Sequence, residues 1–514
     1  MSKTIIIIGA GLAGLSAALQ AAENGCNVKL VSSLPSERAQ SVMAEGGINA
    51  ALNTKDENDS PEEHFTDTIK AACGLADPNA VWGMTQAAPE LVHWLLKLGV
   101  KFNMSGYDDV DLRNFGGQKK KRTAFAQSDT GKQIMTAMID AVRRKEASGM
   151  VERFSHHSFL TLRLCGNICC GCVIRDEYSQ EIVELPGNAV IVASGGMHGL
   201  FGNTTGSLSN TGEVTAELFR LGVPLANGEM IQYHPTTVEC GGKRMLISEA
   251  ARGEGGRLFA LRNNQPWYFM EEKYPELGNL MPRDITAREI WKVSHESEVF
   301  LDMTEISDEI ISNKLSGLAD DCMTYLHKDI RKEPVSVLPG IHYFMGGILV
   351  DEQHRTPIQN LYAAGECCAQ YHGANRLGGN SLLGALYGGR VAAKSACEQA
   401  DGVVLSCAAQ IDIPPVQEIV GTKQLNQAMQ DSLGVVRNGN SLLKGIRKVQ
   451  ELKGTLPLLG LAVLQSAFAR KESRGAHWRE DYPECNNRDF LKTTVARFDG
   501  KQIQISFMSV PERR

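Results

Sequence analysis

The chain has 514 residues, a formal net charge of −6, and 43% hydrophobic and 22% charged residues. This length exceeds what one hydrophobic core supports, so two or three domains are expected. The acidic balance argues against nucleic acid as a partner. Because no apolar stretch reaches membrane-spanning length, any membrane contact would have to come through another subunit.

Thirteen cysteines occur without a secretory signal, since the apolar run 5–8 is too short for one. We therefore expect reduced thiols in the cytoplasm. Four of them, Cys165, Cys169, Cys170 and Cys172, surround a predicted turn between two strands. Strand alternation would place Cys170 and Cys172 on the opposite face from Cys169. We predict cysteines that pack in a core, and no metal site.

The chain begins with a predicted strand, a glycine turn, a helix and a second strand. The buried run 5–8 leads into Gly9, Gly11 and Gly14, and the next strand covers residues 28–31. This context makes GxGxxG a dinucleotide-binding fingerprint, with the pyrophosphate on the helix N-terminus. Where the fingerprint expects an acidic residue for the ribose, the chain has Ser32 and Ser33, whose hydroxyls can form a weaker, neutral hydrogen bond.

Two further glycine-rich segments are candidate parts of the cofactor site. The loop in SVMAEGGINAAL offers Ser41, Glu45, Gly46 and Gly47. A second buried strand within 188–194 ends in a glycine pair, which suits the edge of a parallel sheet that closes over a cofactor. That pair is Gly195 and Gly196.

Near residue 370 the sequence predicts a site for an anionic group. A strand in LYAAGE ends at Glu366, whose carboxylate suits the hydroxyls of a ribose or ribityl chain. The segment HGANRLGGNSLL then places Arg376 before a helix that opens at Ser381 and Leu382. The free N–H groups of that helix end favour negative charge.

The pattern changes at Gln232, where short polar loops begin to alternate with helical pieces, and it returns at Gly340. We expect an α/β protein with a discontinuous, Rossmann-like cofactor domain (1–231 and 340–400), an inserted α+β capping domain (232–339) and a helical C-terminal region (401–514). The basic run 119–122 is interpreted as a solvated loop.

Taken together, the motifs resemble the flavoprotein subunits of the fumarate reductase and succinate dehydrogenase family, which also includes L-aspartate oxidase. The segments that carry the resemblance occur in family order: GAGLAG, AEGGINAAL, SDTGKQI, ASGG, QYHPT, SEAARGEGG, PRDITARE, IHYFMGGI, AAGE, HGANRLGGNSL and RKESRGAHWRE. The resemblance implies FAD as cofactor, a mobile cap, and reduction of fumarate to succinate with hydride from flavin N5.

The resemblance also implies roles for individual residues. The substrate carboxylates would be held by His234, Ser248, His342 and Arg376. Arg283 matches the family's proton donor. Glu249 and Arg252, one helical turn apart, would form the relay that reprotonates it.

Two departures from the family pattern matter. The histidine that is covalently joined to flavin in membrane-bound relatives aligns with Gln40, so FAD should be noncovalent. Loss of that link is expected to lower the flavin potential and favour fumarate reduction. Phe115 stands where L-aspartate oxidases carry an acidic residue for the substrate amino group. An apolar side chain would leave an ammonium unpaired, which favours fumarate over aspartate.

Two alternatives remain open: an L-aspartate oxidase, and a flavin-carrying electron-transfer subunit with a vestigial dicarboxylate site. Arg283, His342 and Arg376 speak against the second. The sequence has no CxxCH haem attachment and no second flavin domain, so electrons should come from a partner, such as an iron–sulfur subunit, or from a diffusible reductant.

Overall fold

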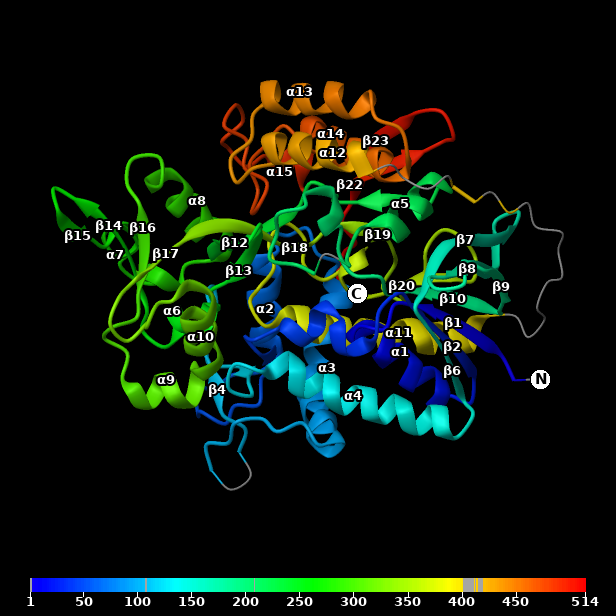
Figure 1. Cartoon of the computed structure of the whole chain (residues 1–514), viewed down its shortest axis with the longest axis horizontal. Helices are drawn as coiled ribbons and strands as arrows, with labels where there is room; N and C mark the ends of the chain where they lie inside the picture. Colours follow the sequence, from blue (N-terminus) through cyan, green and yellow to red (C-terminus); the bar gives the residue numbers. More distant parts are fainter. Residues whose placement is uncertain (1, 107–108, 208, 401–410, 412, 415–418) are drawn as a thin grey trace.

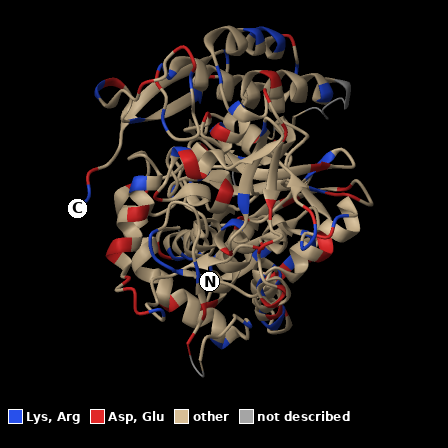
Figure 2. Cartoon of the chain, turned by 90° about the vertical axis from the view of Figure 1, so that its left-hand side faces the viewer, with Lys and Arg blue, Asp and Glu red and all other residues tan. Residues whose placement is uncertain are grey.

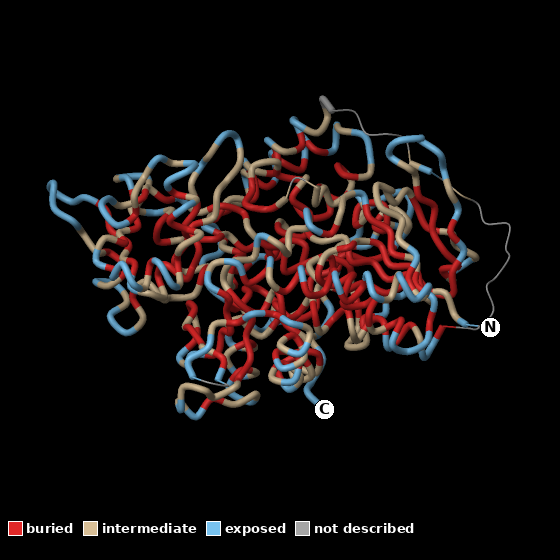
Figure 3. The backbone as a smooth tube through the Cα atoms, turned by 60° about the horizontal axis from the view of Figure 1, so that its bottom comes forward, coloured by how far each residue is buried: buried red, intermediate tan, exposed pale blue. Residues whose placement is uncertain are grey.

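The computed structural model describes residues 2–106, 109–207, 209–400, 411, 413–414 and 419–514 (Figure 1). Part of the C-terminal region that we expect over 401–514 lies outside the described residues. Buried backbone concentrates in the middle of the molecule, while exposed loops surround it (Figure 3).

A five-stranded parallel sheet forms the centre, in the order β20-β10-β1-β2-β6. Its strands are β1 (Thr4–Ile8), β2 (Asn27–Ser32), β6 (Val151–Ser155), β10 (Ala189–Val192) and β20 (Leu361–Ala363). Strands β1 and β10 are apolar along their length because both faces of the sheet are covered. The last strand comes from beyond residue 360, so segments far apart in sequence share one sheet. The predicted α/β class is confirmed.

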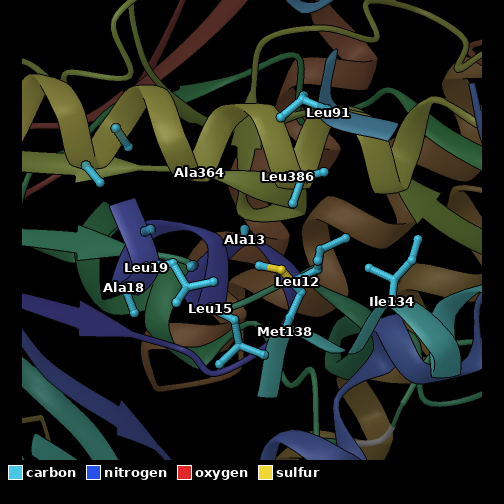
Figure 4. Close-up of a cluster of buried hydrophobic side chains, with 14 of the residues drawn as sticks. Leu12, Ala13, Leu15, Ala18, Leu19, Leu91, Ile134, Met138, Ala364 and Leu386 are labelled. Atoms are coloured by element: carbon cyan, nitrogen blue, oxygen red, sulfur yellow. The ribbon is translucent and has the colours of Figure 1, made fainter. Parts of the chain in front are cut away.

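Helices α1 (Leu12–Glu23) and α11 (Asn380–Gln399) lie side by side on one face of this sheet (Figure 4). Leu12, Leu15 and Leu386 belong to the cluster of buried side chains around them. The helices approach closely: a Cβ added at Gly389 would lie 2.3 Å from the Ala13 carbonyl oxygen. This contact holds the two N-termini at the same edge of the sheet.

An antiparallel sheet of β7 (His157–Cys165), β8 (Ile168–Asp176) and β9 (Ile182–Pro186) packs on the other face. Here the predicted alternation of cysteines is wrong. Leu162 pairs with Cys172 and Leu164 pairs with Cys169, so β8 carries a bulge between them. The bulge brings Cys169 and Cys172, spaced as Cys-x-x-Cys, into one hydrophobic cluster. Among the described residues no group of three or more side chains could hold a metal ion.

The region 232–339 is entered through β12 (Ile231–Cys240) and left through β18 (Leu338–Phe344), which pair antiparallel. Strand β13 (Lys243–Leu246) extends this sheet, and β14 (Arg257–Arg262), β15 (Gln265–Trp267), β16 (Val299–Asp302) and β17 (Val335–Ser336) form a second one. A separate cluster of buried side chains fills the region. It forms the green part at the left of Figure 1.

The helices of this region are short, and each begins in a loop between strands. They are α6 (Glu249–Gly253), α7 (Phe269–Lys273), α8 (Arg283–Val293), α9 (Asp308–Lys314) and α10 (Ser316–Asp321), followed by η5 (Cys322–Leu326). Lys and Arg are interspersed with Asp and Glu over this end of the molecule (Figure 2).

Helices α12 (Ile419–Ser432), α13 (Gly439–Gln450) and α14 (Thr455–Ala469) confirm the helical character of the C-terminal region. A hairpin of β22 (Lys492–Phe498) and β23 (Ile503–Ser509) follows, which the sequence analysis did not anticipate. It joins β11 (Leu225–Ala226), β19 (Gly347–Leu349) and β21 (Cys368–Ala369) in one sheet. Asp499-Gly500 between two alternating runs is a hairpin signal.

Further elements pack around the sheets and helices already described. They include η2 (Gln40–Met43), β3 (Ile48–Asn49), α2 (Pro61–Ala71), α3 (Pro78–Leu98), β4 (Leu112–Arg113), β5 (Thr123–Ala124), α4 (Thr130–Ala147) and α5 (Glu213–Arg220). None of the helices in the described part of the chain combines the length and apolar character that crossing a membrane requires.

One surface expectation is wrong. Arg122, in the basic run 119–122, is fully buried and pairs with Asp59 at 2.8 Å and Asp67 at 2.9 Å. The carboxylate partners lie more than fifty residues away in sequence, so the charge run alone could not reveal the ion pairs.

Candidate active site

A cavity of about 680 Å³ runs from the carboxyl ends of β1 and β2 to the region 232–339. Most of the predicted site residues line it: Gly9, Gly11, Ser32, Ser33, Ser41, Glu45, Gly46, Gly47, Phe115, Gly195, His234, Ser248, Glu249, Arg283, His342, Glu366, Arg376, Ser381 and Leu382. Gly14, Gly196 and Arg252 are not among the residues that line it. The sequence motifs thus converge on one continuous space.

The glycine turn after β1 forms a close-packed cradle at one end. Gly9 has φ +113°, and a Cβ there would lie 2.2 Å from the Ala193 carbonyl oxygen. Gly14 acts beneath the turn, because a Cβ there would lie 1.8 Å from the Gly9 oxygen. Ser41 Oγ accepts a hydrogen bond from Leu12 N at 3.2 Å. The positive end of α1 therefore faces the cavity, as a pyrophosphate requires.

Hydroxyl and carboxylate groups follow along the wall. Ser32 Oγ is buried and has no hydrogen-bond partner among the residues that the structure describes. Glu366 accepts a hydrogen bond from Phe344 N at 3.1 Å, and its Oε1 lies 3.6 Å from His198 Nε2. A Cβ at Gly196 would lie 2.7 Å from Glu366 Oε1, so this glycine leaves space for the carboxylate. These groups fit the hydroxyls of a dinucleotide cofactor.

A second helix N-terminus closes the cofactor part of the cavity. Helix α11 begins at Asn380, one residue before the predicted start, after Gly379 with φ +84°. The Asn380 side chain is held by Asn49 and Thr68 at 2.8 and 3.0 Å. Ser381 and Leu382 stand in the first turn and line the cavity. The N-termini of α1 and α11, the Ser32 hydroxyl and the Glu366 carboxylate together fit a flavin dinucleotide.

At the opposite end, irregular pairing of β12 with β18 brings two histidines together. Gln232 pairs with Tyr343 and Tyr233 with Ile341, so His342 is an extra residue in a bulge. The rings of His234 and His342 lie 5.1 Å apart. Within the described part of the chain, His234 Nε2 is buried without a hydrogen-bond partner, and His342 Nδ1 lies 2.8 Å from Thr205 Oγ1.

Burial and nearby cations keep both imidazoles neutral. The pKa of His234 lies well below its usual value because of burial and then the charges of Arg283 and Arg252. The pKa of His342 is lowered by burial, by His234 and by Arg283. A neutral imidazole has one N–H group, with which it can donate a hydrogen bond to an anionic ligand.

Glu249 links two buried arginines. Its Oε2 accepts hydrogen bonds from Arg283 Nε and Nη2 at 2.8 and 2.6 Å, and its Oε1 accepts one from Arg252 Nη2 at 3.2 Å. Burial would raise the pKa of Glu249, but Arg283 and Arg252 outweigh it and hold the pKa below its usual value. Arg252 also donates to the Asn279 carbonyl at 2.6 Å, which places it behind the cavity wall.

Gln232 is a site residue that the sequence analysis missed. Its Oε1 accepts from Arg283 Nη1 at 3.0 Å, while its Nε2 donates to the Arg376 carbonyl at 2.8 Å and to Asn375 Oδ1 at 2.9 Å. The Gln232 amide thereby links the segment that carries Arg283 to the segment that carries Arg376. Strand alternation could have indicated it, because Gln232 lies two residues before His234 on β12.

Arg376 presents a partly unsatisfied guanidinium to the cavity. None of the described residues hydrogen-bonds its buried Nε, and its Cζ lies 4.3 Å from the centre of the Tyr343 ring. Burial, followed by the charge of Arg283, lowers the pKa of Arg376 to about 9. Two guanidinium groups and two neutral imidazoles in one wall form a receptor for an anion with two carboxylates.

Phe115 is almost fully buried between glycine backbones. A Cβ at Gly46 would lie 2.7 Å from its ring, and a Cβ at Gly378 would lie 2.9 Å from it. The ring presents carbon, not a charge, to the cavity. Ser248 stands opposite as the N-cap of α6, where its Oγ accepts from Ala250 N at 3.4 Å.

Gln40 also lines the cavity, at the start of η2. Its side-chain oxygen accepts a hydrogen bond from Ser207 N. A carboxamide has no nucleophilic ring nitrogen with which to bond a flavin methyl group. This is the chemistry on which the expectation of noncovalent FAD rests.

Comparisons with known proteins agree with this geometry. A model described as "FAD binding domain" matches residues 4–382, and one described as "Fumarate reductase flavoprotein C-term" matches 454–513. The succinate dehydrogenase flavoprotein subunit of Bacillus subtilis is 39% identical, covering 100% of this chain and 98% of the relative. The 8-methylmenaquinol:fumarate reductase flavoprotein subunit of Wolinella succinogenes is 31% identical, covering 100% and 92%.

Among solved structures, a single-site variant of E. coli quinol fumarate reductase FrdA superposes with a TM-score of 0.89 at 28% identity, covering 99% of this chain and 97% of that one. The family resemblance and FAD as the cofactor are thereby confirmed. The chain belongs to the FAD-dependent succinate dehydrogenase and fumarate reductase flavoprotein family.

Proposed function

We propose that the chain interconverts fumarate and succinate. The carrying observation is the wall that combines Arg283 and Arg376 with the neutral imidazoles of His234 and His342. A dicarboxylate loses its hydration shell in such a cavity, and only several donors and cations together offset that cost. Bound FAD supplies a ring that exchanges a hydride with the substrate.

In this proposal the residues divide into two groups. Arg376, His234, His342 and Ser248 hold the two carboxylates and fix the carbon skeleton in one orientation. Arg283 gives a proton to one alkene carbon during reduction and recovers it during oxidation of succinate. Because Glu249 contacts both arginines, the proton that Arg283 loses can be replaced from Arg252 through one carboxylate.

We assign the cofactor roles in the same way. The glycine turn of Gly9 and Gly11 would hold the pyrophosphate, Ser32 and Ser33 the adenosine ribose, and Glu366 the ribityl chain. The loop 41–47 and the N-terminus of α11 would hold the flavin ring. The ranges 1–231 and 340–400 then form one FAD domain, and 232–339 moves as a cap that closes the substrate end.

Repeated reduction of fumarate needs a source of electrons besides the chain itself, because the flavin must be reduced again after each turnover. We propose a protein partner that carries iron–sulfur clusters. We also propose that the chain lies on the cytoplasmic side and that any attachment to a membrane is made through partner subunits. The relatives described above are named as subunits, which supports this assignment. Purification of the native assembly and measurement of its iron content test it; a native assembly that contains no iron would contradict it.

The test of the activity is oxidation of a reduced viologen by FAD-loaded protein. Fumarate-dependent oxidation is expected, with Arg283→Gln inactive and Lys119→Gln, a variant of an exposed residue that does not line the cavity, unchanged. L-Aspartate is the discriminating second substrate, because Phe115 offers its ammonium no partner. Aspartate-dependent flavin reduction that is faster than fumarate turnover would reject the proposal in favour of an aspartate oxidase.

A further inference from the structure

Two cysteines from distant parts of the chain meet where helices α1 and α11 end. Cys26 follows the C-terminus of α1 after Gly25, and Cys397 stands in the last turn of α11. Both are free thiols, and their Sγ atoms lie 3.0 Å apart although 371 residues separate them in sequence. A disulfide bond is about 2.0 Å long, so the two sulfurs need to move only about 1 Å closer to form one.

Backbone anchors on both sides hold the two thiols together. Cys26 N donates a hydrogen bond to Ala21 O at 3.0 Å, which closes the end of α1. The next residue, Asn27, begins β2, and its N donates to the Lys3 carbonyl at 2.8 Å. The Lys3 ammonium in turn donates to the Cys397 carbonyl at 2.6 Å. Lys3 therefore helps to fix the positions of both cysteines, one through its backbone and one through its side chain.

The two thiols differ in exposure, which gives them different tasks. Cys26 is buried, whereas Cys397 is half-buried, so a small oxidant reaches Cys397 first. Burial, followed by the contact with Cys26, raises the pKa of Cys397 to about 12. Because the thiolate is the reactive form of a cysteine, Cys397 should react slowly at neutral pH. The pair is therefore suited to a lasting cross-link, not to rapid signalling.

We propose that hydrogen peroxide converts this pair into a disulfide that ties α1 to α11 behind the FAD site. The Cys397 thiolate attacks the peroxide O–O bond, which leaves a sulfenic acid on Cys397 and releases hydroxide; the hydroxide takes up the proton that the thiol lost and becomes water. The Cys26 thiol then attacks the sulfenic sulfur, the S–O bond breaks, and the oxygen leaves with the Cys26 proton as a second water. One peroxide thus accepts the two electrons that the thiols lose.

The bond would join the ends of the two helices whose N-termini face the cofactor. It would also link the two segments assigned to the FAD domain, 1–231 and 340–400, around the whole region 232–339. Such a cross-link stabilises the fold mainly by restricting the unfolded chain. Neither cysteine lines the cavity, so the bond leaves the residues around the cofactor and substrate in place. We therefore expect the disulfide to slow unfolding and the loss of FAD.

The first test is a map of the disulfides in FAD-loaded protein treated with hydrogen peroxide. Digestion without reductant, followed by mass spectrometry, should yield a Cys26–Cys397 peptide pair that dithiothreitol separates. Cys26→Ser and Cys397→Ser should each abolish the pair, whereas Cys485→Ser, a change at an exposed cysteine, should keep it. Oxidation of Cys397 to a sulfinic acid, with Cys26 still alkylated after denaturation, would overturn the inference.

The second test measures the effect of the bond on stability. The peroxide-treated wild type should unfold at a temperature about 5 °C or more above that of the reduced protein, and flavin fluorescence should show FAD release shifted in the same direction. Peroxide-treated Cys397→Ser should show neither shift, and dithiothreitol should reverse both in the wild type. An unchanged unfolding temperature in fully cross-linked protein would overturn the stabilising role of the disulfide.

Discussion

Glu249 Oε2 binds Arg283 through both Nε and Nη2, at 2.8 and 2.6 Å, so a single carboxylate oxygen fixes the plane of the guanidinium. The third nitrogen, Nη1, is held by Gln232. This arrangement orients Arg283, whereas Arg376 keeps an unpartnered Nε. The two arginines of the cavity are therefore prepared for different tasks.

Arg283→Lys and Arg376→Lys should separate proton transfer from binding. Lysine at 283 keeps the charge but loses the fork that Glu249 and Gln232 hold, so kcat should fall by about a thousandfold or more with a smaller change in KM. Lysine at 376 loses a planar contact to a carboxylate, so KM should rise most. Steady-state kinetics on FAD-replete variants measures both. Near-normal kcat with a raised KM in Arg283→Lys would make Arg283 an anion clamp.

FAD should leave the protein on acid precipitation, because Gln40 cannot form a histidyl bond to the flavin. The measurement is flavin fluorescence in the supernatant and on the denatured polypeptide band. Gln40→Ala is the matched control and should release FAD equally. Fluorescence that stays with the wild-type band would show a covalent link at another residue.

Phe115 should exclude a charged group from the substrate end of the cavity. Phe115→Glu places a carboxyl group against Gly46 and Gly378 and beside a dianion, so kcat/KM for fumarate should fall by about a hundredfold or more. Phe115→Leu keeps the site apolar and should stay within about tenfold of the wild type. If Phe115→Glu retained wild-type kcat/KM for fumarate, the ring would lie away from the bound substrate.

The buried ion pairs of Arg122 should dominate local stability. Arg122→Met leaves Asp59 and Asp67 without their cation and should cost about 3–5 kcal/mol. Lys121→Met is the matched control, because Lys121 is half exposed, its contact with Glu57 is 3.9 Å long, and such pairs contribute about 1 kcal/mol or less. Denaturant unfolding of both variants measures the difference.

The pH dependence of the Arg122→Met deficit has a definite sign. Burial raises the pKa of both Asp59 and Asp67 even while Arg122 opposes it, so the folded protein binds their protons more tightly than the unfolded chain. Such groups destabilise the fold increasingly as pH rises above their ordinary value of 3.8. Removing Arg122 enlarges this effect. The deficit should therefore shrink as the pH is lowered, and a deficit that grows in acid would contradict this account.

The residues that could be predicted from sequence are those whose role follows from the residues next to them in the chain. Gly9, Gly11 and Gly14 stand between a buried strand and a helix, and Arg376 stands before a helix, so short-range pattern suffices. Strand alternation could have placed Gln232 on the face of His234, but not its role, because that role depends on Arg283 and Arg376, which arrive from two other segments. The ion pairs of Arg122 were missed for the same reason, because Asp59 and Asp67 are distant in the chain. The bulge that aligns Cys169 with Cys172 lies within a local hairpin, and simple strand alternation does not reveal it.

The order of strands in the central sheet bears on how the chain folds as it is synthesised. Strand β10 pairs with β1 across more than 180 residues, and its other edge stays open until Leu361 pairs with Val190. Helix α11, which covers α1, emerges later still. A nascent chain of about 350 residues therefore exposes an unpaired parallel edge and an uncovered apolar helix face. Ribosome-bound intermediates of that length should depend on chaperones, and protection of β10 from proteolysis should appear only after residues 361–399 have left the exit tunnel.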